Sequence, residues 1–293
     1  GVAQLFLDPD DSNHRSGVVV YGDNGLVWFY LHLKPSSITT KLDWMTNRKV
    51  RVKRGELLGV ISSQIPTFPH LHLELWNDAL PVNPIPYLKP LKDNKKPEIG
   101  RIHFYKNNTD ERIKDSLNGL PVVYGDVDIV AEIQDRIPPS PYSLTPYRID
   151  YQIEPLNEET GGRAFRMRPY RFDILPGLGR LPIARNYWRI DPYLLELQGK
   201  VHNIFKFSAD SQTYSHFIKR KRRYFYILTN SMNGKISEEK GYWNTDKKRR
   251  GEAVYPDGRY RITVSAYDYA GNKGEKSVDV LVENEESSSE SDD

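Results

Sequence analysis

Apolar and polar residues alternate with a period of two in several segments of this chain. The clearest are 126–135 (DVDIVAEIQD) and 259–268 (RYRITVSAYD). This period is typical of strands in antiparallel sheets that bury one face. A 3.6-residue apolar period is missing from residues 1–88, and a short helix is expected only at 191–199. The pattern therefore predicts an all-β protein.

Turn signals and a polar segment divide the chain into two predicted domains. The first, residues 1–88, is expected to be a small antiparallel sheet, with Asp-Asn-Gly at 23–25 closing a hairpin. The Lys- and Pro-rich segment 89–98 is predicted to be a linker. Residues 99–284 are expected to form a β-sandwich with a long insertion. The acidic tail 285–293 is predicted to be disordered. The expected strands lie at 2–7, 17–22, 26–33, 49–63 (with turns at Gly55 and Gly59), 70–76, 99–105, 127–135, 147–154, 170–175, 203–208, 223–230, 258–268 and 276–284.

Composition narrows the possible chemistry. The 293 residues include no cysteine, which rules out disulfides and thiolate metal sites. Any zinc site must therefore use histidine and carboxylate ligands. No apolar run approaches the roughly 20 residues of a membrane-spanning helix, so no transmembrane segment is expected. The net charge is +3, although residues 283–293 carry six acids and no base.

Three of the seven histidines are candidates for a shared site. His70 and His72 lie two apart in PHLHLEL (69–75), so a strand would place both on one face. His32 lies near the end of an earlier strand, LVWFYLHL (26–33). Imidazole is the commonest metal-ligating side chain. An isolated His-x-His on an amphipathic strand also occurs by chance, and a lone histidine among apolar residues is more often part of a core.

The order of five short motifs resembles the lysostaphin/LytM-type zinc metallopeptidases. The resemblance covers about residues 1–88. The motifs are Tyr30-Leu31-His32-Leu33, VKRGELLG (52–59), Pro69, His70-Leu71-His72-Leu73-Glu74, and Val82-Asn83-Pro84 with Tyr87.

The resemblance implies roles for these residues. His72 is expected to bind Zn²⁺, and His32 and His70 are expected to be catalytic, activating water and stabilising the oxyanion. Glu74 matches a common family position and is expected to support the ligands from outside the coordination sphere.

Two features depart from the family pattern. The other two family ligands come from a His-x-x-x-Asp motif, which has no counterpart in residues 1–31; Asp8, Asp10, Asp11 and His14 occur at the wrong place in the order. The chain begins at Gly1 in mid-pattern, so we expect a fragment whose remaining ligands and any signal peptide lie upstream. This fragment is expected to be inactive by itself. The segment before His-x-His also lacks the glycines usual in the family.

The end of the second domain, YPDGRYRITVSAYDYAGNKGEKSVDVLVEN (255–284), resembles the last hairpin of Ig-like or fibronectin-like sandwiches in bacterial surface proteins. The turn Ala270-Gly271-Asn272 supplies the reversal. Two basic runs, KRKRR (219–223) and KKRR (247–250), suit either an anionic polymer or a solvated edge. The aromatic pattern of RNA-binding modules is missing, so no nucleic acid partner is expected.

Three interpretations follow. The leading one is an exported bacterial zinc endopeptidase, periplasmic, extracellular or on the cell envelope, that cleaves peptide cross-links of peptidoglycan. The second is a non-catalytic LytM-like domain that binds and regulates a cell-wall hydrolase, with a cell-envelope protein as its partner. The third is a structural β-protein with incidental histidines, which predicts that His32 lies far from His70 and His72.

Overall fold

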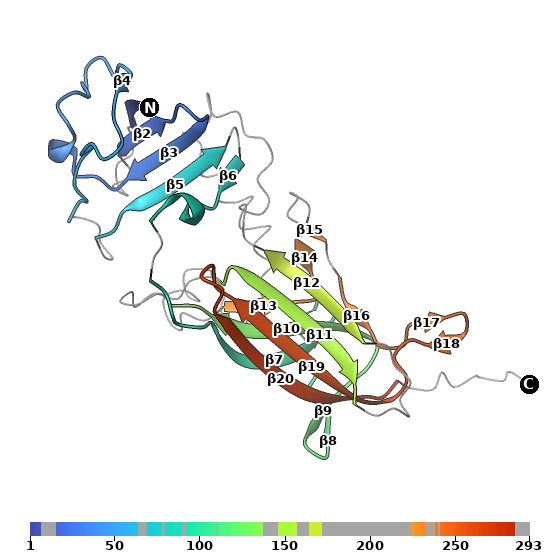
Figure 1. Ribbon diagram of the computed structural model, residues 1–293. Coiled ribbons are helices and arrows are strands. Elements are labelled where there is room, and N and C mark those ends of the chain that lie inside the picture. The colour runs from blue at the N-terminus through green and yellow to red at the C-terminus, as the bar shows by residue number, and fades with distance from the viewer. Residues whose placement is uncertain are drawn as a thin grey trace, which may run out of the picture. The chain divides into compact units, whose positions relative to one another are not determined.

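The computed structural model describes residues 1–6, 16–63, 69–77, 80–89, 92–109, 111–136, 146–156, 164–171, 224–232, 238–239 and 241–284. Their regular structure consists of strands and two short 3-10 helices, η2 (Pro35–Ser37) and η3 (Ile85–Tyr87). This confirms the predicted all-β fold (Figure 1). Neither helix in this part of the chain has the length and apolar character that crossing a bilayer requires.

The chain forms two compact units. The described residues up to 89 belong to the first unit, and those from 92 to 171 and from 224 onward belong to the second. The division between residues 90 and 91 falls inside the segment predicted as a linker. The predicted helix at 191–199, the strand at 203–208, KRKRR and the acidic tail lie outside the described residues.

The first unit is one antiparallel sheet with the strand order β4-β1-β2-β3-β5-β6. Gly25 has a positive φ of 81° in the tight turn between β2 and β3, as the Asp-Asn-Gly signal predicted. The strands are β1 (Val2–Phe6), β2 (Gly17–Tyr21), β3 (Leu26–Leu31), β4 (Val50–Arg51), β5 (His72–Asn77) and β6 (Leu80–Val82).

Both faces of this sheet bury apolar side chains. The face that carries Ala3, Leu5 and Val18 packs against the connection between β3 and β4, through Ile38 and Leu42. On the opposite face Val19, Val27, Phe29, Leu31 and Trp76 form a second cluster. A sheet buried on both sides has a rigid backbone, which suits it to fix side chains at the ends of its strands.

The second unit is a sandwich of two sheets. In one, β10 pairs with β7, β13 and β16; the other has the order β12-β11-β19-β20-β9-β8, in which only β20 and β9 run parallel among the pairs described. The strands are β7 (Glu98–Lys106), β8 (Ser116–Leu117), β9 (Leu120–Val123), β10 (Asp126–Gln134), β11 (Arg148–Pro155), β12 (Phe165–Arg171), β13 (Tyr224–Ile227), β16 (Trp243–Asn244), β19 (Gly258–Tyr267) and β20 (Lys273–Val282). Two small hairpins complete the unit: β14 (Ser231–Met232) with β15 (Glu238–Glu239), and β17 (Lys248–Arg249) with β18 (Glu252–Ala253).

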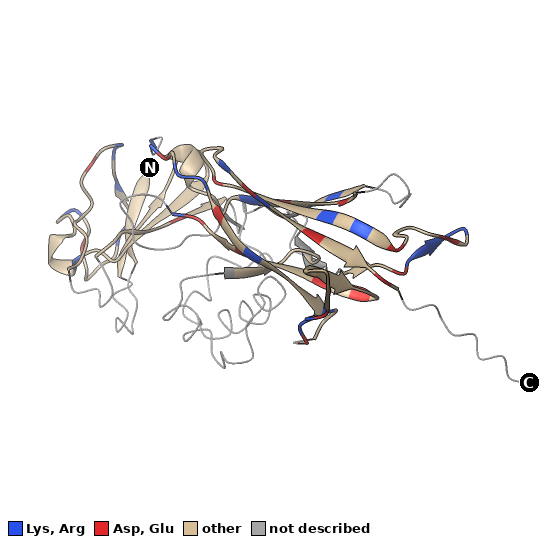
Figure 2. Ribbon diagram, turned by 90° about the horizontal axis from the view of Figure 1, so that it is seen from below, with Lys and Arg blue, Asp and Glu red and all other residues tan. Residues whose placement is uncertain are grey.

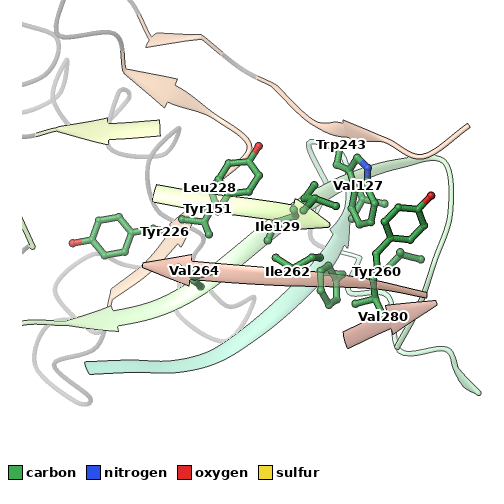
Figure 3. Packing of buried hydrophobic residues seen from close by; sticks show 14 of the residues in the cluster. Val127, Ile129, Tyr151, Tyr226, Leu228, Trp243, Tyr260, Ile262, Val264 and Val280 are labelled. Atoms are coloured by element: carbon green, nitrogen blue, oxygen red, sulfur yellow. The ribbon is translucent and has the colours of Figure 1, made fainter. Parts of the chain in front are cut away.

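Alternate residues of the long strands supply one continuous core between these sheets (Figure 3). Ile129 of β10 and Ile262 of β19 are fully buried there, as is Tyr260. Trp243 packs edge-on against Tyr255 and Tyr260 at one end of the core. The period-two pattern of 126–135 and 259–268 therefore marks the inward positions of facing sheets.

Several strand boundaries in the first unit differ from the predicted ones. The predicted strand 49–63 is a strand only at Val50–Arg51, and the predicted strand 26–33 ends at Leu31. Strand β5 begins at His72 rather than at His70, so His70 lies in the irregular segment before the strand. The segment NPIPYL (83–88) contains a turn of 3-10 helix, Ile85–Tyr87, and Asn83 Oδ1 accepts a hydrogen bond from the Ile85 amide at 2.9 Å. An Asn followed by two prolines favours this capped turn because Pro pre-sets φ and lacks an amide donor.

A buried acidic group in the second unit gives a prediction on pH. Asp135 and Asp268 are each only 4% exposed. Burial, together with the charges of Asp268 and Asp93, raises the pKa of Asp135 to about 6. Because the folded-state pKa lies above the unfolded one, this group's contribution to stability is complete below about pH 4 and lost as the pH rises through about 6. We expect Asp135→Asn to stabilise the protein by roughly 2 kcal/mol at pH 8 and to have little effect at pH 4. Urea unfolding at both pH values measures this, and equal effects at the two would contradict it.

Candidate functional site

His32 stands at the end of β3 in an unusual backbone conformation. Its φ of 64° lies in the left-handed region, which costs a non-glycine residue about 1–3 kcal/mol. In an uninterrupted strand, His32 would project to the face opposite Leu31 and opposite His72, which pairs with Leu31 across β3 and β5. The left-handed residue breaks that alternation and allows the His32 ring to approach His72.

The neighbouring backbone holds His32 in this conformation. The Ser62 amide donates to the His32 carbonyl at 2.8 Å, and the Lys34 amide donates to the Val60 carbonyl at 2.8 Å. On the other side, the Leu33 amide donates to the Ser16 carbonyl at 3.3 Å. The segment GVISS (59–63), the end of the fourth predicted strand (49–63), therefore pairs with residues 32–34, including the bridge between Leu33 and Ile61, instead of forming a longer strand of its own.

The structure brings the three predicted histidines together. The centroid of the His32 ring lies 5.0 Å from that of His70 and 5.5 Å from that of His72, and both pairs meet edge to face. His70 and His72 are exposed, so a ligand reaches the cluster from solvent. These distances contradict the interpretation that the histidines are incidental, because it required His32 to lie far from the other two.

Glu74 fixes the orientation of His72. Its Oε1 lies 2.7 Å from His72 Nε2, while its Oε2 accepts a hydrogen bond of 2.9 Å from Trp76 Nε1. Trp76 is only 5% exposed, so it anchors the carboxylate to the core of the sheet. An ionised carboxylate can only accept hydrogen bonds, so this contact places the His72 proton on Nε2. The Nδ1 of His72 is then the nitrogen with a lone pair to offer.

The sequence identified the three histidines and Glu74, but not how these residues are coupled. The role of Trp76 as the hydrogen-bond donor to Glu74 was not predicted. Its position two residues after Glu74, on the same face of the strand, could have indicated it. The left-handed conformation of His32 had no signal in the sequence. Asp8, Asp10, Asp11 and His14, considered as substitutes for the missing family ligands, lie outside the described residues.

Histidine nitrogens and a carboxylate are ligand types that zinc prefers, but the described residues do not form a complete zinc site. In the ranges that the structure describes, no group of three or more His, Asp or Glu side chains is arranged to hold a metal ion. A neutral imidazole backed by a carboxylate is a common zinc ligand, and His72 with Glu74 has that arrangement. Of the described residues, His72 is thus the one that would hold zinc, through Nδ1, and further ligands would have to come from elsewhere.

Two other residues of the five motifs, Tyr30 and Tyr87, lie on the face of the sheet opposite His72 and Glu74. Trp28 stacks on Tyr30 with ring centroids 6.4 Å apart, and Tyr87 meets Trp28 edge-on at 6.1 Å. Burial raises the pKa of Tyr30 above its usual value. The contact between Trp28 and Tyr87 therefore secures the η3 segment to the sheet.

A scan against models of known protein families, a search of curated protein sequences and a search of solved structures each found no match to this chain.

Proposed function

We propose that the first unit is the catalytic part of a zinc endopeptidase that hydrolyses the peptide cross-links of bacterial peptidoglycan. The observation that carries the proposal is the convergence of His32, His70 and His72 at ring-centroid distances of 5.0 and 5.5 Å. The order of the sequence motifs around them, which resembles the lysostaphin/LytM-type peptidases, supplies the substrate class. The same proposal includes the location of the protein: it is exported and acts in the cell envelope.

Each histidine has a distinct task in this proposal. His72 would hold zinc through Nδ1, with further ligands from outside the described residues, and Glu74 keeps the His72 proton on Nε2. When bound, zinc supplies Lewis acidity toward the scissile carbonyl and toward the water that attacks it. His32 and His70 border the same space, where one accepts a proton from the attacking water and the other donates to the developing oxyanion.

The strain at His32 supports a functional role. A non-glycine residue with a φ of 64° persists only where its surroundings enforce it, and such residues cluster at active sites. Here the enforcement comes from the hydrogen bond between Ser62 and His32 and from the pairing of residues 33 and 61. The same backbone geometry brings the His32 ring to its two partners.

A second candidate function rests on the incomplete ligand set. Because no complete metal-binding group occurs among the described residues, a non-catalytic LytM-like domain that binds and regulates a cell-wall hydrolase is the alternative. The two functions differ in what they require of zinc, since the regulator needs none.

Digestion of purified peptidoglycan tests the proposal. The protein tested is the full-length one, with the expected ligands upstream of Gly1. We expect it, when zinc is added, to release new peptide amino groups, and we expect this release to stop when a chelator is added. A protein that binds one zinc per chain but releases no amino groups from any cross-linked peptide would rule out the peptidase. Stimulation of a separate hydrolase by the zinc-free protein would support the regulator.

A further inference from the structure

The second unit carries a cluster of three arginines around one buried aspartate. Asp150 of β11 has a side chain that is 5% exposed. Arg168 Nε lies 3.1 Å from its Oδ1, and the Nη2 atoms of Arg148 and Arg166 lie 3.3 and 3.7 Å from its Oδ2. One carboxylate therefore faces three guanidinium groups, and we call these four residues the arginine cluster.

The carboxylate compensates only part of the positive charge in the arginine cluster. Three guanidinium groups, which remain charged at any physiological pH, exceed the single Asp150 charge by two. Asp150 Oδ2 and Arg148 Nε are buried without a hydrogen-bond partner, so the ion pairs are not arranged bidentately. Asp150 therefore holds the three guanidinium groups close together but neutralises only one of their three charges.

The cluster presents its remaining donors to solvent. The side chain of Arg166 is 66% exposed and that of Arg168 is 49% exposed. The guanidinium group of Arg148 lies over the Tyr267 ring, with its carbon 3.8 Å from the ring centroid, and this contact holds the side chain in place. A guanidinium group fixed in this way loses less side-chain entropy on binding an anion than a free surface lysine does.

Two further arginines lie along the same face of the sheet, together with two carboxylates. Glu154 of β11 lies opposite Arg261, so Arg259 and Arg261 with Asp279 and Glu154 have no excess positive charge. Arg261 of β19 pairs with Asp279 at 2.8 and 3.0 Å, and Arg259 Nη2 lies 3.7 Å from the same carboxylate. Ser265 lies opposite Asp150, and Arg261 is four residues from Ser265 along β19. Four residues of strand span about 13 Å, and an even spacing keeps both groups on one face.

The outward neighbours of the arginine cluster are polar. They include Gln152 on β11, Thr263 and Ser265 on β19, and Glu275 on β20, which accepts a hydrogen bond from Ser265; the Tyr267 ring lies under Arg148. The large apolar side chains that are exposed elsewhere in the described part of this unit are Leu117, Phe165, Tyr242 and Tyr269. Phe165 pairs with the inward residue Ile153, so it belongs to the other side of the sheet. This face therefore offers cations without apolar side chains to insert into a bilayer.

We propose that the outward face of β11, β12 and β19 binds a linear polymer that carries phosphate groups. Guanidinium groups match phosphate oxygens bidentately. The arginine cluster has an excess of two positive charges, and Arg259, whose side chain is 50% exposed, presents a further guanidinium group along the same face, so repeated charges fit this face better than a single ion does. Basic residues occur on the sheets of this unit and on the β17–β18 hairpin (Figure 2). The hairpin is the rival location, but no described side chain anchors the basic residues of its KKRR run. This proposal is independent of the peptidase proposal, because it concerns the other unit.

Binding of linear polyphosphate to the intact protein tests the proposal. We expect Arg166→Gln/Arg168→Gln to weaken binding at least about tenfold and the matched hairpin variant Lys248→Gln/Arg249→Gln to weaken it less than about threefold. Wild-type affinity should fall as salt is raised, and inorganic phosphate should bind more weakly than the polymer. Arg166→Gln alone checks for misfolding, because its contact with Asp150 is the longest, at 3.7 Å. It should weaken binding with unchanged thermal stability.

Three results would overturn the proposal. Equal or larger loss in the hairpin variant would move the site to β17–β18. No binding of polyphosphate to the wild-type protein at low salt would remove the site altogether. Binding to vesicles of phosphatidylglycerol and phosphatidylcholine, without binding to polyphosphate, would instead identify a membrane surface as the partner.

Discussion

Replacing His72 with alanine is expected to abolish zinc binding by the intact protein. His72 is the described residue whose free nitrogen, Nδ1, is directed by a carboxylate partner at 2.7 Å from Nε2. Loss of one protein ligand leaves too few donors for a stable tetrahedral site. We expect about one zinc per chain in the wild type and less than about a tenth of that in the variant after dialysis. Metal analysis of the two purified proteins measures this directly, and release of amino groups from peptidoglycan should disappear in parallel.

Two further variants make this experiment specific. Glu74→Gln keeps the size of the side chain but weakens its hold on His72, so we expect a 10–100-fold loss of zinc affinity, in the range of about 1.4–2.8 kcal/mol. His70→Ala should retain zinc and lose peptidase activity, since His70 is assigned to proton transfer. Equal zinc content in the wild type and in His72→Ala would contradict the ligand assignment. No zinc in the wild type would favour the regulator.

Replacing Gly17 with alanine is expected to destabilise the first unit strongly. A Cβ at this position would lie 2.0 Å from the Tyr30 carbonyl oxygen and 2.9 Å from Leu31 Cα. Both atoms belong to the backbone, so no side-chain rotation relieves the clash and the end of β2 must separate from the end of β3. We expect a loss of about 3 kcal/mol or more in the free energy of unfolding. Chemical denaturation followed by tryptophan fluorescence measures it.

The same change should disturb the histidine cluster, because His32 directly follows Leu31. We therefore expect the zinc affinity of Gly17→Ala to fall even under conditions in which the protein remains folded. Gly59→Ala is the matched control: its Cβ would lie 3.3 Å from Leu33 Cδ1 and 3.4 Å from Ser37 Oγ, which are side-chain atoms. A change below about 1 kcal/mol is expected there. Similar stability of the two variants would show that β2 and β3 are not held as closely as described.

Most of the all-β architecture followed from the sequence for a local reason. Residues 259–268 alternate because β19 has one face toward the core, and the period of two is set by the strand itself. Residues 126–135 alternate in residue type in the same way, but β10 is buried on both faces, with Asp128 and Glu132 only 3% and 5% exposed. The hairpin at Asp-Asn-Gly is also local, since Gly25 alone provides its positive φ. The start of β5 was less predictable, because His70 carries the same alternation as the strand yet lies outside it.

The candidate site also combines features that could be predicted from the sequence with features that only the tertiary structure sets. The sequence by itself determined which side chains could do the chemistry: His32, His70, His72 and Glu74 are identifiable from residue type and spacing. Only the tertiary structure decided that the His32 ring reaches the other two, because a left-handed residue held by Ser62 reverses the direction that strand alternation would give it. It also decided that Trp76 anchors Glu74 and that three arginines from β11 and β12 surround Asp150. These arrangements depend on strand pairing between distant segments, and the energy of that pairing is not encoded in any short stretch of residues.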